Sequence, residues 1–132
     1  MRFMLLQNYG PVESECAPMT EWTPEEIDAH IEFQQVLNRE LVESGELVDA
    51  QGLAGPDQAR FVVSDGVGAP VVTDGPFPET KELLAGYRLV DVETADRAIE
   101  IAARASAAPS PNGPIRQPIE VRQVLGGPDP EV

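Results

Sequence analysis

The sequence predicts a single α+β domain, from its length, its composition and the order of its periodic segments. The chain has 132 residues, of which 42% are hydrophobic and 24% are charged, and these values are typical of one globular domain. The segments follow the order strand, helix, strand, strand with a hairpin extension, strand, helix, strand. We expect residues 1–125 to form this domain and residues 126–132 to form a flexible tail.

Apolar runs and alternating segments predict the strands. The first run, Arg-Phe-Met-Leu-Leu-Gln, is apolar on both faces and therefore belongs at the centre of a sheet. A turn dipeptide, Asp65-Gly66, joins the two arms of a hairpin in the middle of the chain. The predicted strands are residues 2–7, 47–53, 60–64, 69–73, 84–92 and 119–125.

Two helices are predicted from capping residues and from helical periodicity. Thr23, followed by proline, caps the first helix, Glu26 completes a capping box, and Gly45 ends the helix. Thr94 caps the second helix, which ends at Pro109 at the latest. The predicted apolar faces comprise Ile27, Ile31, Leu37, Leu41 and Val42 in the first helix and Ala95, Ala98, Ile99 and Ala102 in the second.

This order of elements contains the split βαβ pattern of ferredoxin-like domains, with a hairpin extension. Both helices of such a unit lie on one face of the sheet, whereas the first strand is apolar on both faces. The second face therefore needs another cover, and a second subunit packed sheet to sheet would supply it. We expect the protein to be a homodimer.

Charge and cysteine content exclude several classes of partner. The formal net charge is −14, from 23 acidic and 9 basic residues, and it repels nucleic acid and anionic membrane surfaces. The single cysteine, Cys16, cannot form an internal disulfide, and its glutamate neighbours favour a bystander thiol over a nucleophile. Without a signal peptide or a stretch long enough to span a bilayer, a cytoplasmic location is predicted.

Three polar residues interrupt the apolar arc of the first helix. His30, Gln34 and Asn38 fall within the sheet-facing arc. An unsatisfied buried polar side chain costs about 1 to 3 kcal/mol, so a polar cavity or a ligand is the less costly arrangement. A neutral imidazole hydrogen-bonded in the core accounts for His30 equally well. In a pocket, the imidazole could act as a general base near neutral pH.

A second feature is the turn at residues 74–77, Asp-Gly-Pro-Phe, which restricts the backbone and aims the aspartate. Together with the acidic-Thr-Lys-Glu run at residues 79–82 and the dipeptide Gly86-Tyr87, it resembles the signature of the DGPF subgroup of the YCII-related family. The resemblance extends to Met-Arg-Phe-Met-Leu-Leu at residues 1–6, Ser-Gly-Glu-Leu at residues 44–47 and Ile-Glu-Val-Arg at residues 119–122.

The resemblance implies a ferredoxin-like dimeric α/β barrel. It also implies a His and Asp pair at the cleft of the sheet as an acid/base centre, and a genomic position beside extracytoplasmic-function sigma factors. It implies no particular reaction. Carried to this chain, the aspartate corresponds to Asp74 and the histidine to His30.

Three further residues are candidates for ligand binding. Lys81, the only lysine, stands inside the signature and could bind a substrate or pair with a neighbouring glutamate. Tyr87 lies on an alternating strand, where its hydroxyl could face a ligand or be hydrogen-bonded within the core. Arg116 could clamp an anion if the proline-rich loop at residues 107–118 folds over the cleft.

No metal and no cofactor are predicted. The carboxylates of Asp74, Glu79 and Glu82 lack the dense spacing of a calcium loop, and no redox motif, phosphate loop or nucleotide fingerprint is present.

Two functions from different classes remain. The first is an enzyme for proton transfer or hydrolysis of a small organic molecule at a cleft of the dimer, with His30 as base and Asp74 as acid or orienting group. The second is a non-catalytic module that binds a small molecule or a protein in a sigma-factor-linked regulatory circuit. A fold can host either function.

Overall fold

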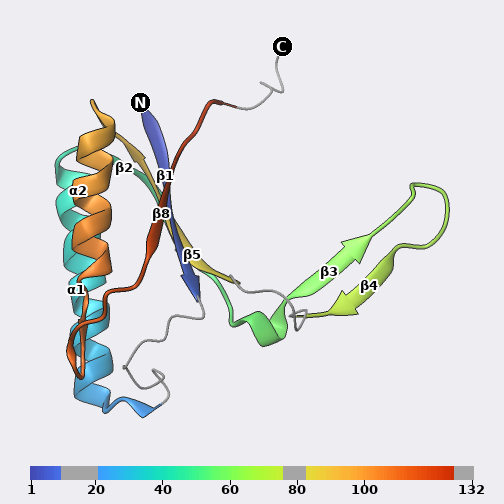
Figure 1. Ribbon diagram of the computed structural model, residues 1–132, viewed down its shortest axis with the longest axis horizontal. Helices are drawn as coiled ribbons and strands as arrows, with labels where there is room; N and C mark the ends of the chain where they lie inside the picture. The colour runs from blue at the N-terminus through green and yellow to red at the C-terminus, as the bar shows by residue number, and fades with distance from the viewer. Residues whose placement is uncertain (10–20, 76–82, 127–132) are drawn as a thin grey trace.

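The computed structural model describes residues 1–9, 21–75 and 83–126, and its main elements follow the predicted order (Figure 1). The strands are β1 (Arg2–Tyr9), β2 (Leu47–Gly52), β3 (Arg60–Val63), β4 (Val71–Asp74), β5 (Leu83–Asp91), β6 (Pro109–Ser110), β7 (Gly113–Pro114) and β8 (Ile119–Gln123). The helices are α1 (Pro24–Glu43), the short 3-10 turn η2 (Pro56–Gln58) and α2 (Ala95–Ser106).

The main sheet has four strands in the order β2-β5-β1-β8, and every neighbouring pair is antiparallel. β1 and β2, which α1 connects, therefore run in the same direction with β5 between them. β5 and β8, which α2 connects, likewise enclose β1. This interleaving is the split βαβ arrangement, and it makes the α+β architecture consistent with a ferredoxin-like fold.

Both helices lie on one face of this sheet (Figure 1). β1 sits between β5 and β8, as its apolar sequence predicts, and its side chains on the helix side are almost fully buried. The core between the layers consists of Phe3, Leu5, Leu37, Leu41, Val90, Val92, Ala98, Ile101, Ala102 and Ala105.

The start of α1 confirms the predicted capping box. The Thr23 hydroxyl accepts a hydrogen bond from the Glu26 amide at 3.2 Å, and the Glu26 carboxylate accepts one from the Thr23 amide at 2.9 Å. Beyond the last turn, Gly45 adopts φ 76°, a left-handed conformation that only glycine adopts without strain. Both ends of the helix are therefore determined by local sequence.

The buried faces of the helices are narrower than the predicted arcs. In α1 the buried residues are His30, Leu37 and Leu41, whereas Ile31 and Val42 are 46% and 62% exposed. Ile31 and Val42 lie about 120° and 140° from Leu37 at 100° per residue, beyond the contact of a helix with a flat sheet. Neither helix in the described ranges is long and apolar enough to span a membrane.

The buried face of α2 also differs from the predicted one. Ala98 and Ala102 are buried as expected, but Ile99 is 55% exposed and Ala95 is also exposed. The remaining buried positions are Ile101 and Ala105, which lie on the other side of Ala98. The prediction of a face of small residues was correct, but the buried face is rotated about the helix axis relative to the predicted one.

The strands β3 and β4 form a separate two-stranded sheet that projects from the body as an arm (Figure 1). Gly75 of the Asp-Gly-Pro-Phe motif directly follows the arm, and a Cβ there would lie 2.1 Å from the ring of Phe61. The motif residues that follow, Pro76 and Phe77, lie outside the described residues. Apolar side chains remain exposed along the arm, although a two-stranded sheet is marginally stable alone in water. The exposed valines are Val62, Val63, Val67, Val71 and Val72.

The proline-rich segment at residues 107–118 is an ordered excursion. It contains the short antiparallel pair β6 and β7, and β6 packs against α1. Arg116 has φ 55°, and its side chain is exposed. The segment therefore reaches α1 through β6 rather than through Arg116.

An ion pair joins α2 to the turn before β2. Arg97 donates through Nε and Nη2 to the two carboxylate oxygens of Glu46, both at 2.9 Å. These hydrogen bonds hold the pKa of Glu46 at about 2, below its ordinary value of 4.5; burial opposes this shift, and the Ser44 hydroxyl adds to it. Because the folded pKa is depressed, the stabilisation is present above pH 4.5 and is lost as the pH falls towards 2.

We predict that Glu46→Gln lowers the free energy of unfolding at neutral pH and that its difference from the wild type shrinks as the pH falls through this window. Denaturant unfolding at a series of pH values measures the difference. Glu100→Gln is the matched control, since Glu100 is 66% exposed and contacts the same arginine at 3.1 Å; its effect should be smaller. An equal loss for Glu46→Gln at every pH would contradict the assignment.

The close approach of β2 and β5 depends on Gly86, at which a Cβ would lie 2.8 Å from the carbonyl oxygen of Gln51. We predict that Gly86→Ala lowers the free energy of unfolding by about 1 to 3 kcal/mol, because backbone atoms would have to move apart. Its cross-strand partner Gly52 is the control, since nothing lies within 4 Å of a Cβ there. Thermal unfolding of the two variants compares them, and equal losses would show that the contact is unimportant.

Candidate functional site

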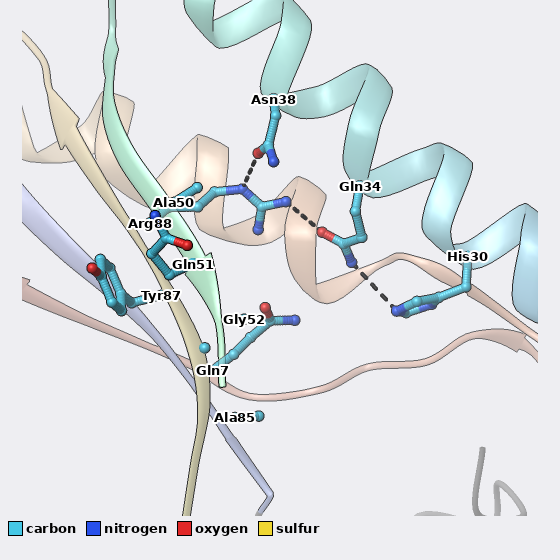
Figure 2. A pocket seen from close by; sticks show the side chains of 11 residues that line it. Gln7, His30, Gln34, Asn38, Ala50, Gln51, Gly52, Ala85, Tyr87 and Arg88 are labelled. Atoms are coloured by element: carbon cyan, nitrogen blue, oxygen red, sulfur yellow. Dashed lines mark hydrogen bonds between the residues drawn. The ribbon is translucent and has the colours of Figure 1, made fainter. Parts of the chain in front are cut away.

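A polar cavity of about 230 Å³ lies between α1 and the sheet, at the end of the layer away from the apolar core (Figure 2). The sheet side of the cavity is formed by β1, β2 and β5, with small residues on two of these strands. The residues that line it are Gln7, His30, Gln34, Asn38, Ala50, Gln51, Gly52, Ala85, Gly86, Tyr87 and Arg88.

The helix side of the cavity is the polar stripe that the periodicity of α1 predicted. His30, Gln34 and Asn38 are spaced four residues apart, so they stack one turn above another on the same side of the helix. Figure 2 shows the three side chains pointing towards the sheet. The stripe therefore lies over a polar cavity on the sheet side.

Arg88 on β5 provides the cationic side chain of the cavity. Its Nε donates to the Asn38 side-chain oxygen at 2.7 Å, and its Nη2 donates to the Gln34 side-chain oxygen. The residue is only 6% exposed, and burial lowers the pKa of the guanidinium. Side chains alternate along β5, so Arg88 lies on the same face as Val90; its contact with α1 was not predicted from the sequence.

The imidazole of His30 is oriented by a backbone carbonyl. Its Nδ1 lies 3.0 Å from the carbonyl oxygen of Pro109, the first residue of β6. Because a carbonyl oxygen can only accept, Nδ1 carries the hydrogen, and in the neutral ring Nε2 is then an acceptor. The ring of Trp22 packs edge-on against the imidazole, with centroids 5.5 Å apart. The ring is thus held from both sides, and its basic nitrogen lies on the side of Gln34.

Gln34 connects the histidine to the arginine. Its Nε2 lies 3.5 Å from Nε2 of His30, while its side-chain oxygen accepts from Arg88 (Figure 2). In this series of hydrogen bonds each donor faces an acceptor, in the order Arg88, Gln34, His30, Pro109. The guanidinium can only donate, so it determines which way the amide of Gln34 points.

Tyr87 contributes to the cavity wall, but its hydroxyl lies on the opposite face of the sheet. It donates to the Asp49 carboxylate at 2.8 Å, and this bond holds the pKa of Asp49 low and the pKa of Tyr87 high. In Figure 2 the ring points away from the cavity. The alternative of a hydrogen-bonded structural tyrosine therefore fits its position better than contact through the hydroxyl.

The structure does not bring Asp74 or Arg116 to this cavity. Asp74 ends β4 on the projecting arm, where its side chain is 90% exposed and lies 3.9 Å from Arg60. The described residues contain no hydrogen bond or ion pair between His30 and Asp74, so one chain does not form the expected pair. Arg116 is not among the lining residues, and Lys81 lies outside the described residues.

The side chains of the cavity are suited to hydrogen bonding and not to metal coordination. Among the described residues, its lining has one imidazole, four carboxamides and a guanidinium, and no carboxylate. In residues 1–9, 21–75 and 83–126, no group of three or more histidine, cysteine, aspartate or glutamate side chains is arranged to hold a metal ion. The donors of the cavity favour a ligand rich in acceptor oxygens.

Comparison with known proteins confirms the resemblance at the level of the YCII-related family, without distinguishing a subgroup. A family model for the YCII-related domain matches residues 1–117. The chain is also similar to an uncharacterized protein of Rhizobium meliloti (strain 1021), with 35% identity over 81 residues, covering 61% of this chain and 64% of that protein. The chain therefore matches somewhat less than two thirds of the length of this relative.

Proposed function

Because the chain belongs to the YCII-related family, a membership that specifies no reaction, we propose its function from the cavity: the protein binds a small polar organic molecule between α1 and the sheet. One observation carries this proposal. His30, Gln34 and Arg88 converge from two layers on one open cavity and not on an apolar core. Concave sites with a few convergent polar groups are the usual form of small-molecule sites.

A sigma-factor-linked regulatory role, which the family resemblance implies, is one form of this proposal. In that role the cavity would receive the small-molecule signal. No enzymatic step is required, because binding alone can shift a conformational equilibrium that a partner protein senses.

An acid/base enzyme is the second candidate, and the orientation of His30 favours it. Nδ1 is engaged by the Pro109 carbonyl, so Nε2 is the nitrogen that could take a proton from a molecule in the cavity once that molecule replaces Gln34 as its hydrogen-bond partner. In this version the carbonyl performs the orienting role that the sequence had suggested for Asp74. Turnover of a bound compound would distinguish this candidate from simple binding.

The homodimer expected from the sequence is also part of the proposal, as a dimeric α/β barrel. On the face of the sheet without helices, Met4 pairs with Leu89 and Leu6 pairs with Tyr87, and these side chains are only partly buried within one chain. A second copy packed on this face would cover them. The exposed valines of the β3–β4 arm provide further apolar surface for such a contact.

For the cavity, we predict that binding of small polar compounds perturbs the NMR signals of His30, Gln34 and Arg88 and that Ala50→Leu abolishes these changes. Ala50 pairs directly with Arg88 across the sheet, so a larger side chain there fills the cavity. Ala103→Leu on the exposed side of α2 is the matched control and should leave binding intact. A screen of neutral, anionic and cationic compounds in which none binds, or in which Ala50→Leu changes nothing, would refute the proposed function.

For the dimer, we predict that light scattering at micromolar concentration gives twice the mass of one chain and that Leu89→Arg yields a monomer. The arginine would place a charge in the centre of the packed sheet face. Ile99→Arg, at an exposed position of α2, is the control and should remain dimeric. A wild-type protein that is monomeric under these conditions would contradict the proposal.

A further inference from the structure

Arg88 carries a buried positive charge for which the described residues provide no carboxylate. It is the only arginine in the described ranges that is classed as buried. Several arginines nearer the surface lie within 4.0 Å of a carboxylate, whereas the partners of Arg88 are two neutral amide oxygens. The arginines with carboxylate partners are Arg2, Arg60, Arg97 and Arg104.

The hydrogen bonds of Arg88 leave part of the guanidinium available. A guanidinium has five N–H donors, and those used are one on Nε, towards Asn38, and one on Nη2, towards Gln34. Nη1 has no hydrogen-bond partner within the described part of the chain. Figure 2 shows this nitrogen facing away from α1, into the space that Gln7 also enters. The end of the guanidinium formed by Nη1 and Nη2 is therefore directed at the cavity.

Asp49, which adjoins the cross-strand partner of Arg88, does not neutralise this charge. Asp49 lies next to Ala50 on β2, but its carboxylate accepts from the Tyr87 hydroxyl on the opposite face. An isolated buried charge is costly, whereas a buried charge that is paired with an anion and hydrogen-bonded is tolerated. An anion that pairs with Arg88 would therefore come from outside the described residues.

We infer that the molecule bound in this cavity is a small carboxylic acid, whose carboxylate accepts hydrogen bonds from the free Nη1 and Nη2 donors of Arg88. This inference rests on the proposed function and names the class of its ligand. The planar fork of an arginine matches the two oxygens of a carboxylate. One cationic side chain also suits a single negative charge better than the double charge of a phosphate group.

The remaining groups of the cavity define the rest of the ligand. A volume of about 230 Å³ is smaller than a typical site for a drug-sized molecule, roughly 300 to 1,000 Å³, so the acid has few heavy atoms. Nε2 of His30 can accept from a ligand hydroxyl that replaces the Gln34 carboxamide, which lies 3.5 Å away, as its donor. The Gln7 carboxamide can donate to or accept from a polar substituent. A short hydroxy or oxo acid fits these groups.

Isothermal titration of the full chain with acids and their neutral amides tests this inference. The probes are lactate with lactamide and benzoate with benzamide, at constant ionic strength, with inorganic phosphate as a further anion. We expect at least one acid to bind about tenfold or more tightly than its amide, because charge-assisted hydrogen bonds are the stronger ones. Inorganic phosphate binding more tightly than both acids would overturn the carboxylate assignment.

Three arginine variants assign the preference to Arg88. In Arg88→Gln the acid and its amide should bind within about twofold of each other, whereas Arg97→Gln, which changes an arginine outside the cavity, should keep the wild-type ratio. Arg88→Lys retains the charge without the fork, and should favour the acid by less than the wild type does. If Arg88→Gln does not fold, the acid-to-amide ratio of Arg88→Lys tests the contribution of Arg88 in its place. A ratio unchanged by Arg88→Gln, or abolished equally by Arg97→Gln, would overturn the inference.

The failure of this inference can be distinguished from failure of the proposed function. If the amides bind in the cavity as tightly as the acids, and Ala50→Leu abolishes both, the cavity is a binding site but the carboxylate assignment is wrong. If neither acids nor amides nor the wider set of compounds binds, the proposed function itself is wrong.

Discussion

The contact of Arg88 with two side chains of α1 is the interaction on which the candidate site depends. A guanidinium on the helix-facing side of a sheet would ordinarily be excluded from a core. Here Gln34 and Asn38 accept from it, one turn apart on the helix. The amide of Gln34 then has only one useful orientation, which presents its nitrogen to His30. One buried cation thereby determines how the neighbouring polar groups point.

The layer between the helices and the sheet changes character along its length. At one end, Leu37 and Leu41 of α1 meet Phe3 and Val90 and form a close-packed apolar core. At the other end, the same face of α1 presents its polar stripe, and β5 presents Arg88 followed by Gly86. The apolar end provides most of the hydrophobic stabilisation, so the polar end can remain partly hollow.

The two faces of β5 serve different purposes in the proposed assembly. Arg88 lies on the helix side and belongs to the cavity, whereas Tyr87 and Leu89 lie on the side without helices, where the second copy is proposed to pack. Alternation along one strand therefore separates the proposed ligand site from the proposed subunit contact by a single residue.

Much of the fold could be predicted because its signals are local. The cap at Thr23, the glycine at Gly45 and the apolar first strand depend on neighbours in sequence, and the structure agrees with all three. The prediction of the buried helix faces was less accurate, since Val42 and Ile99 are apolar but exposed. Periodicity gives the direction of an apolar arc, but the width that is covered depends on the flat sheet against which the helix packs.

The candidate site, like the fold, could be predicted only where its features depend on one helix or one strand. The sequence by itself determined that His30, Gln34 and Asn38 share one side of a helix and that Arg88 shares a strand face with Val90, because both statements follow from the repeat of a single element. Only the tertiary structure decided that these two faces meet, that Pro109 orients His30, and that Asp74 lies on a separate arm. These contacts join residues tens of positions apart, and their geometry is set by how the layers pack, which no local repeat encodes.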